Sequence, residues 1–433
     1  MEASRYIREN KGFSFLNVPR ELCALFILFW GINPASFTYQ WAVYAAVILL
    51  WVAFAMMSQW KKFWDTIFEP VILLSFCWPV LLGIYSIAGH AEFPFHHLMM
   101  PIFYVLFWFY YKLEDNHFSL KLLGLLTAGY YVLINVGTLL ALRKNPDVSR
   151  FLAGGVTPLT LELANPLVGG FQHIYSLTMF TVALVGIIWY YRPALSKTLL
   201  LGATVLLGLL TILKSNYSFA ILFVGAFCLL VLCRPPKGGG KTVAVLLVCF
   251  LLALVVLPNL YKIFYFIADN TGSLKMQLRF REVGNLLQGS GITQGSDAGT
   301  RVALYTASLK TWTTSPLFGI GDWTIRLAEN PREIVGGHSV VCDFMAYYGL
   351  AGSVIFHSIL ISLFVKLEKL LDRRGKFLYL VVFVLYYVQI TVNTGYNEAL
   401  IEVLFFLIPS LLLAAGEPVP DKNAECRVSR YIR

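Results

Sequence analysis

Apolar runs of about 20 residues recur along the 433-residue chain, separated by short polar segments. We place twelve such runs, at residues 21–37, 40–58, 67–89, 98–111, 119–142, 171–190, 198–213, 217–233, 242–265, 339–365, 377–393 and 399–415. An α-helix needs about 20 apolar residues to cross a bilayer, so this pattern predicts an all-α polytopic membrane protein with about twelve transmembrane helices. Transmembrane β-barrels instead show alternating segments of about ten residues, a pattern that this chain lacks.

The composition favours the same class. Hydrophobic residues make up 58% of the chain and charged residues 13%, whereas a soluble domain carries about 25% charged residues. The net charge of +10 does not indicate nucleic-acid binding, because the basic residues flank apolar runs instead of forming one stripe. Six of the seven cysteines lie in or beside apolar runs and none has metal-ligand spacing, so we expect no disulfide framework and no zinc site.

The distribution of lysine and arginine predicts the orientation of the chain. With the N-terminus in the cytoplasm, 22 of the 34 Lys and Arg residues lie on the inner side. Every short loop except the turn at Lys214 then follows the positive-inside rule, from which long translocated loops are largely exempt. We therefore expect both termini in the cytoplasm, and an uncleaved first helix because no small-residue cleavage site follows the first apolar run.

This orientation divides the chain into four parts. They are 1–260 with transmembrane helices one to nine and a first long outward loop at 143–170, a large outward loop at 261–338, helices ten to twelve at 339–416, and a cytoplasmic tail at 417–433. In the first outward loop, residues 157–168 are apolar enough to dip into the membrane or to pack on the helix bundle.

The large outward loop is the longest interval without a spanning run, and it has predicted structure of its own. Residues 277–288 have helical spacing, while 289–299 are polar and Gly-rich and are expected to be mobile. We expect a further helix over residues 301–312, capped by Asp297 or Thr300 and ended by the Ser-Pro pair that follows.

Arginines in both outward loops predict a site for a lipid diphosphate. The guanidinium group is planar, always charged and carries five donors, which suits pyrophosphate oxygens. Arg301 is the first candidate because it opens a helix just before a Gly-containing turn. Arg279 and Arg281 point to different faces of a helix, so we expect one of them to reach the site, with Arg150 approaching from the opposite wall. The alternative is that these arginines only solvate the loops or contact lipid headgroups.

His338 begins the apolar run that follows the large loop, with Ser339 as a predicted N-cap. The positive end of a helix dipole disfavours an imidazolium, so His338 is a candidate general base for a sugar hydroxyl. Asp343 lies about one turn deeper, where an ionisable group in a membrane helix suggests function. It is a candidate to orient His338, to pair with an arginine or to hold the acceptor, and a plain structural ion pair is the alternative.

Glu398 and Glu402 lie one turn apart at the outer end of the last apolar run. Together with Asn393 and Asn397 they are candidates to line a polar substrate cavity, against the alternative of a structural role. No nucleotide-binding glycine pattern or Ser-His-Asp arrangement stands out, and no residue pattern indicates a metal or cofactor.

The segment from residue 301 to 352 carries a resemblance. It reads Arg-Val-Ala-Leu-Tyr, then Ser-Pro-Leu-Phe-Gly-Ile-Gly-Asp, then Gly-Gly-His-Ser-Val-Val-Cys-Asp-Phe-Met-Ala-Tyr-Tyr-Gly-Leu-Ala-Gly. This resembles the signature region of the O-antigen polymerase and O-antigen ligase superfamily of the bacterial inner membrane. The resemblance implies a periplasmic site in which Arg301 and His338 bind pyrophosphate and activate the acceptor.

Two departures from the ligase pattern favour a polymerase. Ligases carry an arginine in a Ser-Arg-Gly-like turn between two middle helices, and here that turn is 214–218, Lys-Ser-Asn-Tyr-Ser. Ligases usually have Asn after the histidine, where this chain has Ser339. The implied partners are an undecaprenyl-pyrophosphate-linked oligosaccharide, membrane lipid and a chain-length regulator protein.

The expected activity is metal-independent glycosyl transfer, without a cofactor, from undecaprenyl pyrophosphate to a lipid-linked repeat unit. We expect inversion at the sugar carbon, since no carboxylate pair suggests a covalent intermediate. The alternatives are an O-antigen ligase that transfers glycan to lipid A-core and, from another class, a flippase or transporter of lipid-linked oligosaccharides. A transporter predicts buried charges in the middle of the membrane and short outer loops.

Overall fold

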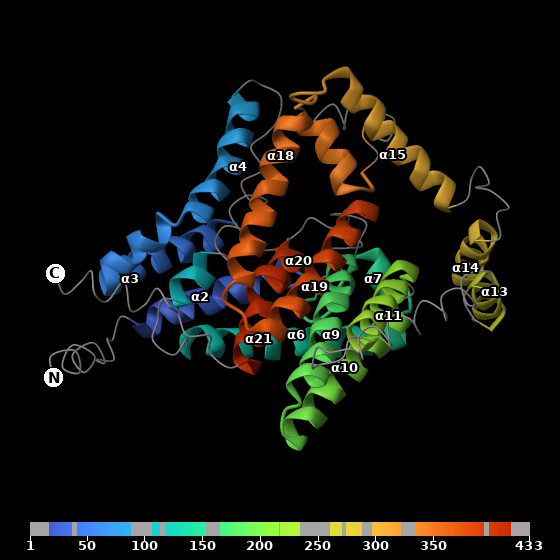
Figure 1. Cartoon of the computed structure of the whole chain (residues 1–433), viewed down its shortest axis with the longest axis horizontal. Coiled ribbons are helices and arrows are strands. Elements are labelled where there is room, and N and C mark those ends of the chain that lie inside the picture. Colours follow the sequence, from blue (N-terminus) through green and yellow to red (C-terminus); the bar gives the residue numbers. More distant parts are fainter. Residues whose placement is uncertain are drawn as a thin grey trace.

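Helix α9 (Phe171–Tyr191) lies at the centre of the fold, and other apolar helices pack around it (Figure 1). It contacts α10 (Leu195–Lys214), α11 (Ser218–Cys233), α19 (Arg373–Val392) and α20 (Glu398–Glu402). No Asp, Glu, Lys or Arg occurs along α9, and most of its side chains are buried. A helix that is apolar all round is stable only when neighbours or lipid cover every face, which explains this central position.

The structure, a computed structural model, describes residues 17–36, 41–87, 106–112, 118–152, 165–215, 217–233, 260–270, 274–287, 297–321, 335, 337–393 and 398–416. These residues contain helices and no strand. The remaining elements are α2 (Asn17–Ile32), α3 (Trp41–Ile67), α4 (Pro70–Ile87), α6 (Phe118–Lys144), α7 (Val148–Phe151), α13 (Leu260–Asn270), α14 (Leu274–Leu287), α15 (Asp297–Thr314), α18 (Val340–Glu368), the π-helix η4 (Val403–Leu407) and α21 (Ile408–Ala415).

Seven helices within the described ranges are long and apolar enough to cross a membrane, namely α3, α4, α6, α9, α10, α18 and α19. Two shorter apolar helices cover Ser218–Cys233 and Ala399–Ala415. The prediction of an all-helical, multi-pass membrane protein is therefore confirmed. The predicted runs 98–111 and 242–265 fall largely outside the described residues, so the count of twelve stays a prediction.

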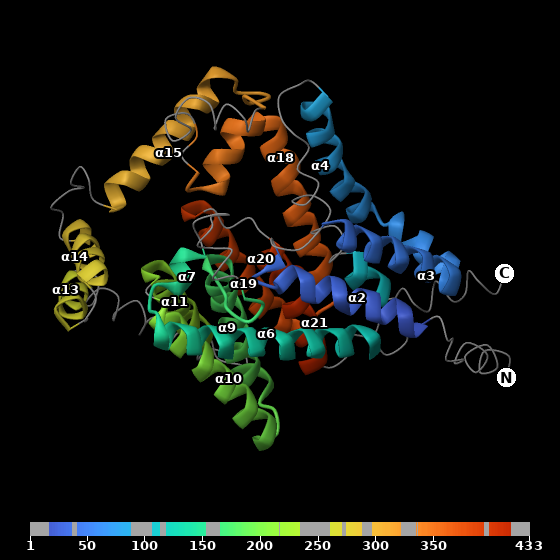
Figure 2. The ribbon, with the colours of Figure 1, turned by 180° about the vertical axis from the view of Figure 1, so that it is seen from behind.

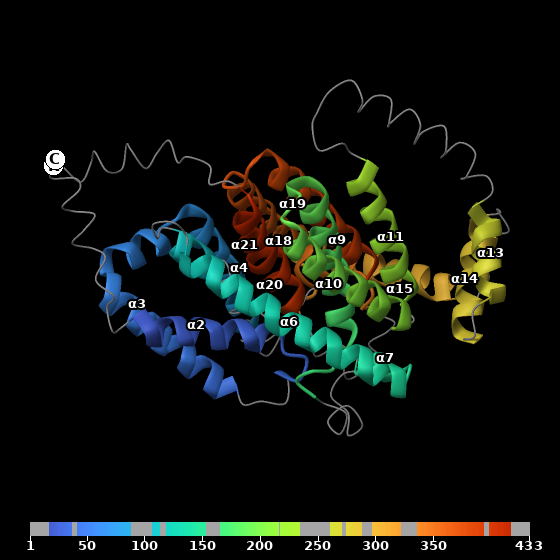
Figure 3. The same ribbon diagram turned by 90° about the horizontal axis from the view of Figure 1, so that it is seen from below.

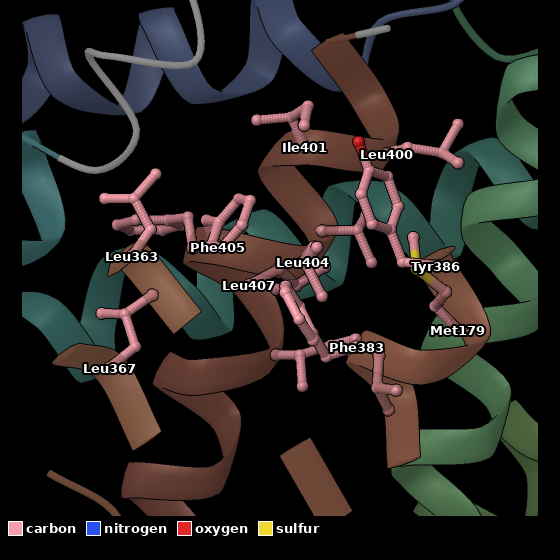
Figure 4. Close-up of a cluster of buried hydrophobic side chains, with 14 of the residues drawn as sticks. Met179, Leu363, Leu367, Phe383, Tyr386, Leu400, Ile401, Leu404, Phe405 and Leu407 are labelled. Carbon is pink, nitrogen blue, oxygen red and sulfur yellow. The ribbon is translucent and has the colours of Figure 1, made fainter. Parts of the chain in front are cut away.

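The bundle has one extended apolar core. Figure 4 shows its centre, where side chains of α9, α18, α19, α20 and η4 meet. Seen from behind, α2 and α6 run side by side across the bundle (Figure 2). α3 kinks at Gln59, one residue after the end of the predicted run 40–58. Apolar packing against many neighbours holds these helices together, as expected for a polytopic protein.

Part of the large loop forms a separate helical hairpin. α13 and α14 lie at one edge of the molecule (Figure 3), where Phe264, Ala268 and Phe280 make a small apolar core. α14 confirms the helix predicted at 277–288. α15 confirms the helix predicted at 301–312 and ends directly before the Ser-Pro pair.

Two loop expectations change. The segment 289–299 was expected to be mobile, but its last residues, 297–299, belong to α15, because that helix begins about one turn before Arg301. Residues 289–296 lie outside the described residues. In the first outward loop, 157–164 lie outside them as well. The end of that loop packs on α6, since the Gly169 amide donates to Thr138 Oγ1 at 2.8 Å and a Cβ on Gly137 would lie 2.2 Å from the Leu167 carbonyl oxygen.

α18 breaks at Gly349, where φ is 62° and ψ is −165°. Residues 316–321 fill the break through backbone hydrogen bonds of 2.8–3.0 Å to residues 346–351. A Cβ on Gly349 would lie 2.4 Å from the carbonyl atoms of Leu317, and Gly319 makes an equally close approach to α18. The predicted span 339–365 therefore consists of two helical arms, and its first arm carries the candidate residues that follow the large loop.

Candidate functional site

Two arginines from distant parts of the sequence lie over aromatic rings at the start of α11. The Arg301 Cζ atom of α15 is 5.0 Å from the centroid of the Phe219 ring. The Arg150 Cζ atom of α7 is 5.2 Å from the centroid of the Tyr217 ring. The Tyr217 hydroxyl donates to the Ser149 carbonyl at 3.0 Å and thereby fixes α7 beside α11. These contacts bring the segment that contains Arg150 and the segment that contains Arg301 to the start of α11.

Arg279 joins this group from α14. It interacts electrostatically with Tyr175 of α9 and with Tyr217, the same two tyrosines that interact with Arg150. Arg281 instead pairs with Asp269 of α13 at 2.9 Å, with both side chains more than half exposed. Of the two α14 arginines, Arg279 therefore interacts with the same tyrosines as Arg150, whereas Arg281 pairs within the hairpin.

We call Arg150, Arg279 and Arg301 the arginine cluster. All three side chains are half-buried. The rings of Tyr217 and Phe219 lie beside them, and neither ring carries a charge at neutral pH. The arginine cluster therefore keeps its positive charge over an uncharged aromatic floor.

Arg301 is anchored to the C-terminal end of α19. Its Nη1 donates to the Val392 carbonyl at 2.9 Å and to Asn393 Oδ1 at 3.0 Å, and Tyr305 donates to the same carbonyl at 3.0 Å. The last carbonyls of a helix lack intrahelical partners and carry the negative end of its dipole, which favours a cation there. One face of the Arg301 guanidinium lies on the Phe219 ring, and its Nη1 is hydrogen-bonded to α19. Together these contacts fix the orientation of the guanidinium.

The turn that carries His338 lies at the start of α18. Ser339 is the N-cap as predicted, and its Oγ accepts from the Cys342 amide at 3.2 Å. The His338 side chain is exposed. The first amide of α18, on Val340, donates to the Asn393 carbonyl at 3.4 Å. The residue that makes this backbone contact with the end of α19 is thus two positions after His338 in the sequence.

Asn393 connects the two halves of the site. Its backbone carbonyl accepts from Val340, and its side-chain oxygen accepts from Arg301. Arg301 and the His338 turn consequently meet at one residue and lie at the same end of the bundle. Asn393 therefore links Arg301 to the turn that carries His338.

Asp343 has a buried carboxylate that faces the turn. Its Oδ1 accepts from Ser308 Oγ of α15 at 2.6 Å and from the Gly337 amide at 3.2 Å, and its Oδ2 accepts from the Ser339 amide at 3.2 Å. The two amides flank His338. Of the roles considered for Asp343, orienting His338 is the one that these contacts support.

Of the two glutamates at the outer end of the last apolar run, Glu402 has a described side chain. Glu402 is completely buried and interacts electrostatically with Tyr131 of α6. The Glu398 side chain and Asn397 lie outside the described residues, so their predicted place in a substrate cavity stays a prediction.

Sequence reasoning missed the aromatic floor of the site. The turn at 214–218 drew attention for its lack of arginine, yet Tyr217 in that turn and Phe219 after it are the rings under Arg150 and Arg301. Pairs of a cation and an aromatic ring are well known in proteins. Here, however, Arg150 is 67 residues before Tyr217, and Arg301 is 82 residues after Phe219. Only the fold reveals them.

The arrangement suits an anionic ligand with several oxygen atoms. Three guanidinium groups supply charge and directed donors, and the neutral rings shield one side from water. Among the described residues, no group of three or more His, Cys, Asp and Glu is placed to hold a metal ion. No family model matches the chain, and no curated protein matches it in sequence.

Proposed function

We propose that this protein is a polysaccharide polymerase of the bacterial inner membrane. It transfers a growing O-antigen or capsular glycan from undecaprenyl pyrophosphate to a lipid-linked repeat unit. The observation that carries the proposal is the convergence of Arg150, Arg279 and Arg301 next to the turn of His338. The site faces the periplasm, and both termini lie in the cytoplasm.

The arginine cluster acts on the leaving group. As the bond between the anomeric carbon and the diphosphate breaks, negative charge grows on the diphosphate oxygens. Donors that are already oriented stabilise such charge without reorganising during the reaction. Arg301 meets this requirement best, because Val392, Asn393 and Phe219 hold its guanidinium in place.

His338 acts on the acceptor. It removes the proton of the attacking hydroxyl, and its exposure gives it access to a substrate that arrives from the periplasm. Asp343 holds the backbone on both sides of His338 and thereby positions the imidazole. The lipid carrier already activates the donor sugar, so no nucleotide is required, and the attack inverts the reacting carbon.

The test is reconstitution of the purified protein in lipid nanodiscs with undecaprenyl-pyrophosphate-linked repeat units. A polymerase produces a ladder of longer lipid-linked glycans and releases undecaprenyl pyrophosphate without an ion gradient. Product that forms only after lipid A-core is added would identify a ligase. Movement of the lipid-linked unit across liposome membranes, with no change in glycan length, would identify a transporter.

A further inference from the structure

The turn at residues 316–321 carries two large apolar side chains on its outside. Leu317 is 61% exposed and Phe318 is 62% exposed. Both belong to the segment that follows α15 and fills the break in α18, close to the end of α4 (Figure 1). Leu350 of α18 and Ile84 of α4 are exposed as well, so the apolar surface of the turn continues onto both helices. A continuous apolar surface of this kind indicates an interaction partner that is itself apolar.

The backbone of the turn is hydrogen-bonded to both sides of the break in α18. The carbonyls of residues 316 and 317 accept from the amides of residues 350 and 351, at 2.8 and 3.0 Å. The amides of residues 320 and 321 donate to the carbonyls of residues 346 and 347, at 3.0 and 2.8 Å. In an unbroken helix those amides and carbonyls of α18 would bond to one another, four residues apart. The turn therefore replaces the hydrogen bonds that the break removes.

Side chains of the protein bond to the turn as well. The Tyr85 hydroxyl, near the end of α4, donates to the Phe318 carbonyl, and the Trp312 indole donates to the Pro316 carbonyl at 3.0 Å. Non-helical backbone at membrane depth is tolerated only where the protein or a water-filled cavity satisfies its polar groups. The hydrogen bonds to α18, Tyr85 and Trp312 meet this requirement, while the side chains of Leu317 and Phe318 stay exposed.

The packing of α4 against α18 gives the depth of the turn in the bilayer. The two helices run antiparallel, from the ion pair of Glu69 and Lys366 at one end to the contact of Tyr85 with the turn at the other. Glu69 and Tyr85 are 16 positions apart, as are Leu350 and Lys366, which is about 24 Å at the helical rise per residue. The hydrocarbon core of a bilayer is about 30 Å thick, and charged groups favour its edge. With the ion pair at one edge, the turn lies within the opposite edge.

We propose that residues 316–321 form a membrane-embedded turn, with the side chains of Leu317 and Phe318 among the acyl chains of the bilayer lipid. Lipid is the occupant because the apolar surface of the turn continues onto exposed faces of α4 and α18, and both helices are long and apolar enough to cross a membrane. Acyl chains remove this apolar area from water, which favours the embedded position. The turn then anchors one end of α15 at the bilayer, while Arg301 attaches the other end to α19.

Photo-cross-linking in nanodiscs of phosphatidylethanolamine and phosphatidylglycerol tests this contact, whether or not the protein transfers glycans. The photoreactive amino acid p-benzoylphenylalanine replaces Phe318, with Leu317 as a second position in case the first variant does not fold. We expect irradiation to add the mass of one phospholipid to the protein, as measured by mass spectrometry. Val354, exposed on the spanning part of α18, is the positive control, and Arg281, exposed and paired in the α13–α14 hairpin, is the negative control.

Phospholipid adducts from the turn and from position 354, but not from position 281, support the embedded turn. Adducts from position 354 alone would overturn it, because the turn would then lie in water. Covalent dimers from position 318 would overturn it as well, because a second copy of the chain would then cover this surface. Phe318→Asp places a charge among acyl chains and should lower the melting temperature in nanodiscs, whereas Thr306→Asp, on the exposed face of α15, should not. Equal melting temperatures of the two variants would contradict the proposal.

Discussion

Replacing Asp343 by Asn tests how the fold positions His338. The carboxylate receives three hydrogen bonds, from Ser308 and from the amides of Gly337 and Ser339. An asparagine oxygen in the place of Oδ1 keeps two of them as neutral bonds, while the amide NH₂ then faces the Ser339 N–H. Bonds to a charged group contribute about 1.5–3 kcal/mol and neutral ones about 0.5–1.5 kcal/mol. One lost and two weakened bonds remove about 3.5–6 kcal/mol from the turn.

This loss is enough to free the His338 turn without unfolding the bundle, because the large apolar core does not depend on it. We expect the kcat for glycan elongation to fall about 100-fold, as a misplacement of about 1 Å can cost that much. KM for the lipid-linked donor should change little, since α19 and not Asp343 anchors Arg301.

The assay is elongation kinetics of the purified variant, with Ser308→Ala as the graded control. Ser308→Ala removes one of the three bonds and leaves the charge, so its effect on kcat should be smaller. An unchanged kcat in a folded Asp343→Asn protein would refute the positioning role. A loss that appears entirely in KM would place Asp343 at the substrate instead.

Three further predictions separate the parts of the account. Arg279→Ala should lower the elongation rate at least 10-fold, because a hydrogen bond from a charged donor contributes about 1.5–3 kcal/mol. Arg281→Ala should change the elongation rate by no more than about twofold, because exposed ion pairs contribute little. Equal effects of the two variants in elongation assays would contradict the proposed site. Gly349→Ala should lower the free energy of unfolding by several kcal/mol, because position 349 has a positive φ and a Cβ there would clash with residue 317. Gly202→Ala is the control, since a Cβ at position 202 meets open space. Melting curves in detergent measure the stability of both variants. Chelation by EDTA should leave elongation unchanged, because arginines supply the positive charge, and activity restored only by a divalent cation would contradict this.

The sequence predicted the parts of the fold that depend on local pattern. Apolar runs of spanning length identified the membrane helices, and the Ser339 cap and the helix containing Arg301 follow from short-range signals. The break at Gly349 did not show, because α18 is continuously apolar and its break depends on residues 316–321, which the fold brings against it.

The sequence predicted what kind of candidate site to expect, but only some of the residues that form it. Helical geometry places Arg279 and Arg281 on different faces, but only the contact with Asp269 decides which one turns away. The role of Asp343 depends on what faces it across α15. Such contacts join distant parts of the chain and leave no periodic signal in it.

The most direct test of the central claim is polymer formation by Arg301→Ala and His338→Ala in cells that contain normal amounts of each protein. Loss of a preorganised donor for developing charge lowers the rate about 100-fold to 1,000-fold. We therefore predict that both variants fail to extend the lipid-linked repeat unit, while Arg281→Ala makes polymer of normal length. Full-length polymer from both Arg301→Ala and His338→Ala would contradict the account.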